Sequence, residues 1–190
     1  MTTPREILEF WFSPRARPLW FERDKDFDDE IRSRFAAVIH AAQQGDLDSW
    51  QQSPESTLAL LLLLDQFGRN VHRGQAKAYL GDARARQIAD RAIAKGFDQH
   101  FSFQQQRFFY LPFEHSENLE DQRRAIALFT LALDRAAPED RDAAAEQLDY
   151  AHRHRIVIER FGRFPHRNDA LGRPSSEAET AFLREPGSSF

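Results

Sequence analysis

The chain has 190 residues and a formal net charge of -4, and 41% of its residues are apolar. A chain of this length and apolar content can bury a hydrophobic core, which excludes a disordered protein. It contains no cysteine, which excludes a disulfide framework, a thiol nucleophile and a thiolate metal site. Its acidic balance argues against a nucleic-acid-binding protein, so we expect no nucleic acid among its partners.

Nothing in the sequence indicates a membrane or an export signal. The longest apolar run is Leu58–Leu64, far shorter than the roughly 20 residues that span a bilayer. Residues 1–12 lack the basic region and the long apolar stretch of a signal peptide. We therefore expect a cytoplasmic protein with no membrane partner.

Helical periodicity and helix start signals cover almost the whole chain. In the first segment, Thr3, Pro4 and Glu6 supply an N-cap, a first-turn proline and a capping-box glutamate. No segment alternates with period two, and no linker composition interrupts the chain. We therefore predict an all-α protein of about eight helices, forming one domain over residues 1–190. The predicted helices cover residues 3–12, 24–45, 53–70, 82–96 with Asp82 as the cap, 104–111, 118–133, 138–161 and 176–183.

The first candidate site follows the leucine-rich helix. Residues 58–64 cover every face of a helix, so we expect this helix to be buried all round. It leads directly into Asp65, Arg69 and Asn70, and the acid stands four residues before the arginine, the favourable order for an ion pair. Either the helix reaches the surface there, or these polar groups line a pocket, because a buried charge must be paired or used.

The second candidate site follows an aromatic run at residues 108–113. We expect Pro112 to end or kink the helix, leaving Glu114 and His115 on irregular backbone beside aromatic rings. Burial beside rings is one way in which proteins prepare a carboxylate for general acid–base catalysis. The alternative is an ordinary helix start with a cap and a first-turn acid, made by Ser116 or Asn118 and by Glu117.

The third candidate site is rich in arginine. Between His152 and Arg173 the chain has six arginines but only two acids, Glu159 and Asp169. Arginine forks bind carboxylates and phosphates, so this segment predicts an anion site. The alternative is a structural network in which the arginines pair with helix carbonyls and with Asp65 or Glu114. The candidate ligand contacts of this segment are His154, Arg160, Arg163, Arg167 and Asn168, with His166 as a further catalytic candidate.

Metal and cofactor motifs are not evident in the sequence. It has no HExxH, no phosphate-binding loop, no dinucleotide fingerprint and no GxSxG. The nearest match to the Glu-x-x-His pairs of di-iron bundles is a single Asp149-x-x-His152. We therefore expect no metal and no cofactor, with a site of Glu114, His115 and a distant histidine as the alternative.

Three long motifs make the chain resemble a known family. They are LLLLDQFGRN at 61–70, FFYLPFEHSE at 108–117 and HRIVIERFGRFPHRN at 154–168. With ILEFWF at 7–12, they resemble the bacterial "domain of unknown function 924" family over nearly the whole chain. Gly68 departs from the LDQFPRN form of the motif and is expected to loosen that helix end. The resemblance implies antiparallel helical hairpins akin to tetratricopeptide repeats, and no established activity, substrate or cofactor.

Three functional hypotheses follow. The first is a binding module in which a polar and aromatic pocket holds a small anionic ligand or a peptide carboxylate through Arg163 and Arg167. The second is a metal-independent hydrolase or proton-transfer enzyme, with Glu114 as acid or base and His115 or His166 as its partner. The third is a structural or interaction scaffold. The sequence leaves the oligomeric state open.

Overall fold

The computed structural model describes residues 2–188. Over that range it is all-helical and contains no strand, which confirms the predicted fold class. If the continuous segment 54–71 is taken as one helix, eight helices form in this range, in agreement with the prediction. In chain order they are α1 (Pro4–Trp11), α2 (Lys25–Gln44), α3 (Pro54–Leu61) continuing through a π-helical turn (Leu62–Phe67) into α4 (Gly68–Val71), α5 (Asp82–Ala94), α6 (Phe103–Glu114), α7 (Leu119–Arg135), α8 (Arg141–Phe161) and α9 (Glu177–Phe182).

The chain divides into two compact units. Unit 1 contains the residues up to Arg73 and Lys77–Phe109, and unit 2 contains Gly74–Ala76 and the residues from Tyr110 onward. Helix α6 contributes its first part to unit 1 and its last part to unit 2. The single domain over residues 1–190 and the tetratricopeptide-like arrangement both stay predictions, and each unit is described by itself.

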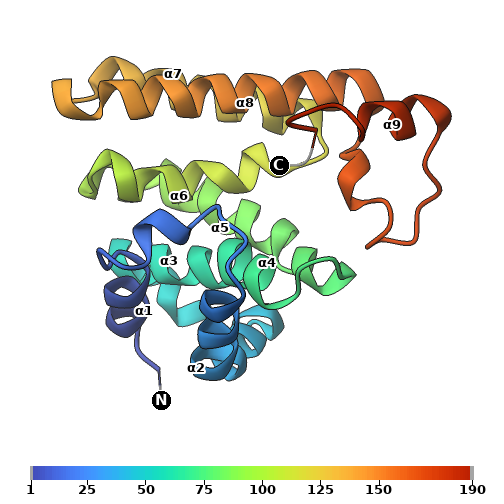
Figure 1. The fold of residues 1–190 in the computed structure, drawn as a ribbon. Coiled ribbons are helices and arrows are strands. Elements are labelled where there is room, and N and C mark those ends of the chain that lie inside the picture. Colours follow the sequence, from blue (N-terminus) through green and yellow to red (C-terminus); the bar gives the residue numbers. More distant parts are fainter. Residues whose placement is uncertain (1, 189–190) are drawn as a thin grey trace. The chain divides into compact units, whose positions relative to one another are not determined.

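Unit 1 is built around the leucine-rich helix. Helix α1 packs on α3, α5 packs on α3 and on the π-helical turn, and α2 packs on that turn and on α4 (Figure 1). Every residue of Leu58–Leu64 is at most 1% exposed, as the all-round apolar pattern predicted. Rings from α1 and α2 close the other side of this core, with Trp11 lying 5.1 Å from Phe67 between ring centroids.

The helix widens at the start of its polar end. Leu62–Phe67 forms a π-helical turn, a rare feature that places Asp65 and Gln66 inside the turn. Gly68 was expected to loosen this helix end, but it begins α4 with ordinary helical angles, φ -57° and ψ -41°. The polar end of the helix is therefore ordered without the proline of the family motif.

Two glycines near this turn lead to opposite predictions. A methyl group on Gly68 would meet the Ala78 carbonyl oxygen at 3.5 Å, an ordinary contact, so Gly68→Ala should raise the free energy of unfolding by about 0.5–1 kcal/mol. A methyl group on Gly81 would lie 2.2 Å from the Leu64 carbonyl oxygen. Gly81→Ala should therefore lower the free energy of unfolding by about 1–3 kcal/mol. Urea denaturation of the two variants checks both signs, and a stable Gly81→Ala protein would contradict the close approach.

Helices α7 and α8 form the largest part of unit 2. They run side by side and are connected through a 3₁₀ turn at Pro138–Asp140 (Figure 1). Asn118 caps α7 by accepting a hydrogen bond from the backbone of Glu120, which confirms one of the predicted caps. Within residues 2–188, no helix is both long enough and apolar enough to cross a membrane.

Pro112 does not end its helix and does not leave Glu114 on irregular backbone, so that part of the prediction was wrong. The proline lies inside α6, and the helix continues to Glu114, with the His115 backbone N–H donating to the Leu111 carbonyl at 2.9 Å. Proline removes one backbone donor, but it does not prevent the residues after it from bonding to earlier carbonyls. Glu114 is therefore held on a regular helix, and His115 directly follows it.

Candidate functional site

The predicted site residues fall into two groups. Asp65, Arg69 and Asn70 belong to unit 1. All of the others belong to unit 2, and they are Glu114, His115, His154, Arg160, Arg163, His166, Arg167 and Asn168.

In unit 1, Arg69 joins two carboxylates. Its Nη1 lies 3.3 Å from Asp65 Oδ1, which confirms the predicted ion pair. The guanidinium also donates to both oxygens of Asp82, at 3.0 and 3.1 Å. Asp82 was predicted to cap α5, but Gly81 occupies the cap position and the carboxylate of Asp82 receives the arginine instead. This pairing ties α4 to the start of α5.

A second arginine of unit 1 makes a similar fork. Arg73 donates to Asp28 through Nε at 2.5 Å and through Nη2 at 3.0 Å, and Asn70 Nδ2 donates to the same carboxylate at 2.8 Å. Asp28 was not predicted, because it lies 42 residues before Asn70 and no periodic pattern connects them. Asn70 therefore has a structural contact on α2.

Burial lowers the pKa of Arg69, but the charges of Asp65 and Asp82 outweigh it and hold the pKa above its usual value. Asp65 is 1% exposed and also accepts a hydrogen bond from Gln66 Nε2 at 2.6 Å. The polar groups at the end of the leucine-rich helix thus bind one another, as expected of buried charges.

In unit 2, Glu114 lies at the centre of a group of polar side chains. It is 1% exposed, its Oε1 lies 3.5 Å from His154 Nδ1, and its Oε2 accepts a hydrogen bond from Gln147 Nε2 at 3.2 Å. Its backbone carbonyl accepts a further bond from Gln122 at 2.5 Å. We refer to Glu114, His115, His154, His166 and Arg167 as the Glu114–His154 cluster.

His154 is an uncharged member of this cluster. It is 3% exposed, and its Nδ1 lies 2.9 Å from the Tyr150 carbonyl. Because a carbonyl only accepts, Nδ1 carries the proton, and the lone pair of the neutral ring is on Nε2. The pKa of His154 is lowered to about 3, chiefly by burial. The neighbouring His115, Arg167 and His166 act in the same direction, and the hydrogen bond to Tyr150 opposes them.

Phe164 brings the remaining members together. The centroid of its ring lies 5.5 Å from that of His154 and 5.6 Å from that of His166, and the guanidinium of Arg167 lies over it at 4.5 Å. The His115 ring lies 6.3 Å from the His154 ring. The structure therefore brings together five residues that the sequence predicted from two separate motifs.

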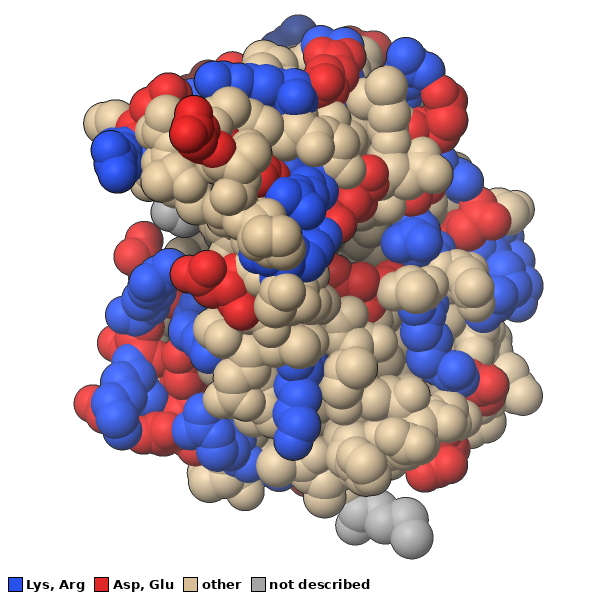
Figure 2. All heavy atoms as spheres, turned by 90° about the vertical axis from the view of Figure 1, so that its right-hand side faces the viewer, with Lys and Arg blue, Asp and Glu red and all other residues tan. Residues whose placement is uncertain are grey.

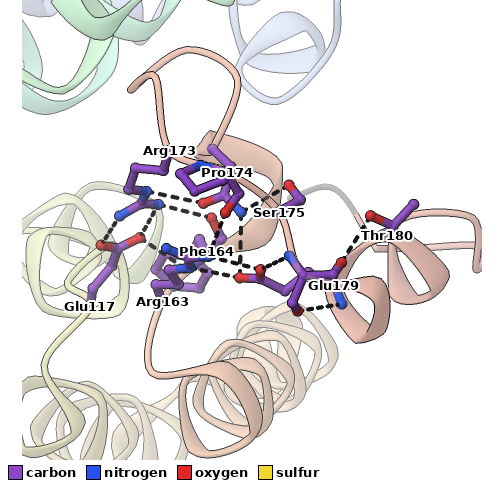
Figure 3. Close-up of polar contacts among 10 residues, drawn as sticks. Glu117, Arg163, Phe164, Arg173, Pro174, Ser175, Glu179 and Thr180 are labelled. Carbon is purple, nitrogen blue, oxygen red and sulfur yellow. Dashed lines mark hydrogen bonds and ion pairs between the residues drawn. The ribbon is translucent and has the colours of Figure 1, made fainter.

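Two arginines of unit 2 are paired with glutamates (Figure 3). Arg163 donates to Glu179 through Nε at 2.6 Å and through Nη2 at 2.8 Å. Arg173 donates to Glu117 through Nη1 at 2.7 Å and through Nη2 at 2.9 Å. The alternative of a structural network thus describes Arg163 and Arg173, with Glu179 and Glu117 as the carboxylates.

The last two predicted contacts of unit 2 have different surroundings. Asn168 is fully buried and donates to Ser175 Oγ at 3.1 Å and to Glu179 Oε1 at 3.4 Å. Arg160 is exposed on α8, with its guanidinium 4.7 Å from the centre of the Phe161 ring. Basic and acidic side chains lie next to one another over the face drawn in Figure 2, in line with this pairing.

No group of three or more His, Asp or Glu side chains placed to hold a metal ion occurs among residues 2–188. The polar residues that sequence reasoning missed are Asp28, Gln122, Gln147 and Glu179, and Glu117 was taken only as a first-turn acid. The first four lie between 8 and 45 residues from the partners described above, and Glu117 lies 56 residues from Arg173. No local motif in the chain connects them.

The described residues thus form an all-helical protein with partly buried Arg–carboxylate forks and a histidine-rich cluster. A family model described as a bacterial protein of unknown function, DUF924, matches residues 7–187. The chain belongs to this family.

A solved structure supports the same assignment. The protein of unknown function ATU0120 from Agrobacterium tumefaciens is 40% identical in sequence and has a TM-score of 0.84. The match covers 95% of this chain and 96% of that chain. No curated protein matches the chain. These matches establish the family and the fold. Both the family and the solved structure are described as being of unknown function.

Proposed function

We propose that the Glu114–His154 cluster of unit 2 binds a small anionic ligand or a peptide carboxylate. The observation that carries this proposal is the convergence of basic side chains around His154. The His115 ring lies 6.3 Å from the His154 ring, and the Phe164 ring contacts His154, His166 and Arg167. The guanidinium of Arg167 lies over the fully buried Phe164 ring, with its central carbon 4.5 Å from the ring centroid. A fixed fork flanked by two imidazoles suits a carboxylate or a phosphate.

Arg163 contributes less to this proposal than the sequence indicated. Its guanidinium already binds both oxygens of Glu179, which is 3% exposed. A ligand carboxylate would have to compete with that pair. Arg167, whose guanidinium lies over the Phe164 ring in the cluster, is the arginine that the experiment tests.

The state of His154 excludes this residue as the general base of the cluster. A general base near neutral pH works best with a pKa close to that pH, and His154 has a pKa of about 3. The enzyme hypothesis then depends on Glu114 with His115 or His166, and the scaffold hypothesis needs no ligand at all. The same binding experiment distinguishes these hypotheses.

We expect anions to raise the melting temperature of the protein. At an anion concentration of about 100 times Kd the stabilisation is about 2.7 kcal/mol, which raises the melting temperature of a chain of this length by roughly 5–11 °C. The panel contains inorganic phosphate, acetate and a short peptide with a free or an amidated C-terminus, each compared with sodium chloride at equal ionic strength.

Arg167→Gln should lose most of this shift, measured from the melting temperature of the variant itself. The matched control is Arg123→Gln, which removes an exposed arginine of α7 that pairs with Glu120. If no anion stabilises the wild type, or if Arg167→Gln retains the full shift, the proposal is wrong.

A further inference from the structure

The turn that carries His166 and Arg167 is fixed at both ends. The turn comprises residues 163–171 and lies between Gly162 and Gly172. Both glycines have the left-handed backbone angles that favour glycine, φ 68° and φ 64°. Between them, Pro165–Arg167 forms a single 3₁₀ turn. The segment has backbone hydrogen bonds of its own, such as the bond from the Leu171 N–H to the Arg167 carbonyl at 3.0 Å. Side-chain contacts from outside the segment add to these bonds.

Glu117 supplies one of these contacts. Its carboxylate accepts hydrogen bonds from the Phe164 backbone N–H at 2.8 Å and from both terminal nitrogens of Arg173. Arg173 Nη2 also donates to the Phe164 carbonyl at 3.2 Å. The Glu117–Arg173 pair therefore binds both backbone polar groups of Phe164 (Figure 3). The ring of Phe164 in turn contacts His154, His166 and Arg167.

The polar contacts continue from this pair to the far side of the turn. Arg173 Nε donates to Asn168 Oδ1 at 3.0 Å, and Asn168 Nδ2 lies 3.4 Å from Glu179, which binds Arg163. Arg163 begins the turn and Arg173 follows its end. Each flank of the turn is thus bound by a guanidinium fork on a glutamate.

We infer that Glu117 is a positioning residue of the proposed anion site, and that with Arg173 it forms a clasp that holds the 163–171 turn against His154. This inference rests on the proposed function. The clasp does not itself touch the ligand. It fixes Phe164, and through Phe164 it fixes the plane of the Arg167 guanidinium.

The electrostatics of Glu117 agree with this role. Burial raises the pKa of its carboxyl, but the hydrogen bonds from Arg173 and from the Phe164 backbone outweigh burial, and the charge of Arg167 adds to them. The carboxylate therefore stays charged at neutral pH and keeps all three bonds. An amide at this position would retain one acceptor for Phe164 but would turn N–H groups toward Arg173.

The experiment compares Glu117→Gln with the wild type in two measurements. The first is hydrogen exchange of the backbone amides of residues 164–171 without ligand. The second is the affinity for inorganic phosphate, from the melting shift over a concentration series. In Glu117→Gln we expect the turn amides to exchange about tenfold faster or more, and phosphate to bind about tenfold more weakly, while exchange in the middle of α7 and α8 stays as in the wild type.

Two further variants separate positioning from a general loss of stability. Arg173→Lys keeps the charge but loses the fork, so both effects should be intermediate. Glu120→Gln removes an exposed glutamate of α7 and should change neither measurement. A uniform rise in exchange over the whole of unit 2 would mean that Glu117 has only a structural role.

Failure of the clasp and failure of the proposed function give different results. If the turn amides exchange at the wild-type rate in Glu117→Gln, the clasp does not hold the turn, whether or not anions bind the protein. Wild-type phosphate affinity in a variant whose turn exchanges faster overturns the positioning role. If phosphate and the other anions fail to bind even the wild type, the proposed function is wrong and the positioning role fails with it, and exchange alone still decides whether the clasp holds the turn.

Discussion

Phe164→Ala should lower the free energy of unfolding of unit 2 by about 3–5 kcal/mol, measured by urea denaturation. The ring is fully buried and belongs to a small apolar cluster with Val157 and Ile158. Its removal leaves a cavity beside the His154 ring and takes the aromatic surface away from Arg167. Both the lost apolar burial and the cavity destabilise the folded state.

Graded and control variants decide whether packing is the cause. Phe164→Leu fills much of the cavity and should lose clearly less stability than Phe164→Ala. Ile156→Ala removes an apolar side chain that is 55% exposed on α8, and should change stability by less than about 0.5 kcal/mol. A loss below about 1 kcal/mol for Phe164→Ala would contradict the packing of this residue, because even the smaller core truncations usually cost more.

The helices could be predicted from the sequence because local signals determine where they begin. Thr3 and Ser176 both form complete capping boxes, and Asp24 and Ser53 each accept a backbone hydrogen bond as an N-cap. These interactions span three residues, so the pattern of residue types contains them in full. The positions of the helices along the chain followed from such signals.

Local rules failed where neighbouring residues changed the outcome. Pro112 was expected to end or kink its helix, but α6 keeps its helical backbone for two more residues. Phe113 is buried, and the guanidinium of Arg124 on α7 lies 4.5 Å from the centre of the Phe113 ring. The π-helical turn at Leu62–Phe67 has no sequence signal that distinguishes it from an α-helix. In both places the packing of the folded chain outweighs the local preference.

The sequence predicted which residues belong to the candidate site, but not which of them bind one another. Glu114 was selected because it follows an aromatic run, and His154 and His166 because they lie in the arginine-rich segment. The structure brings all three together in one cluster. The Arg173–Glu117 fork joins residues 56 positions apart, and neither periodicity nor spacing indicates such a pair. Only the fold determines which acid each arginine meets.

The stability of the protein should fall as the pH is lowered from about 7 to about 5, and His154 should cause much of this loss. Its pKa is about 3 in the folded protein, whereas a histidine in an unfolded chain titrates near 6.5. Between these values the unfolded state binds the additional proton, so acid favours unfolding. The stability gained by a neutral His154 is complete above pH 6.5 and is lost progressively toward pH 3.

The expected loss is about 1.4 kcal/mol per pH unit at most, or roughly 2 kcal/mol between pH 6.5 and pH 5. The pKa values of Glu117 and Glu179 are lowered from 4.5, so these carboxyls act in the same direction but mainly below this range. His72 of unit 1 also acts in this direction, because partial burial, Lys77 and Arg32 lower its pKa. The measurements are therefore made in a His72→Gln background as well.

Urea denaturation at the two pH values measures the effect. His154→Asn keeps a donor for the Tyr150 carbonyl but cannot take up a proton, so its stability should depend clearly less on pH than that of the wild type, even where it is lower at pH 7. The matched control is His152→Asn, which removes an imidazole two residues away on α8, outside the Glu114–His154 cluster, and should retain the wild-type dependence. An unchanged pH dependence in His154→Asn would show that the buried imidazole is not held neutral, because its protonation would then cost the folded state nothing.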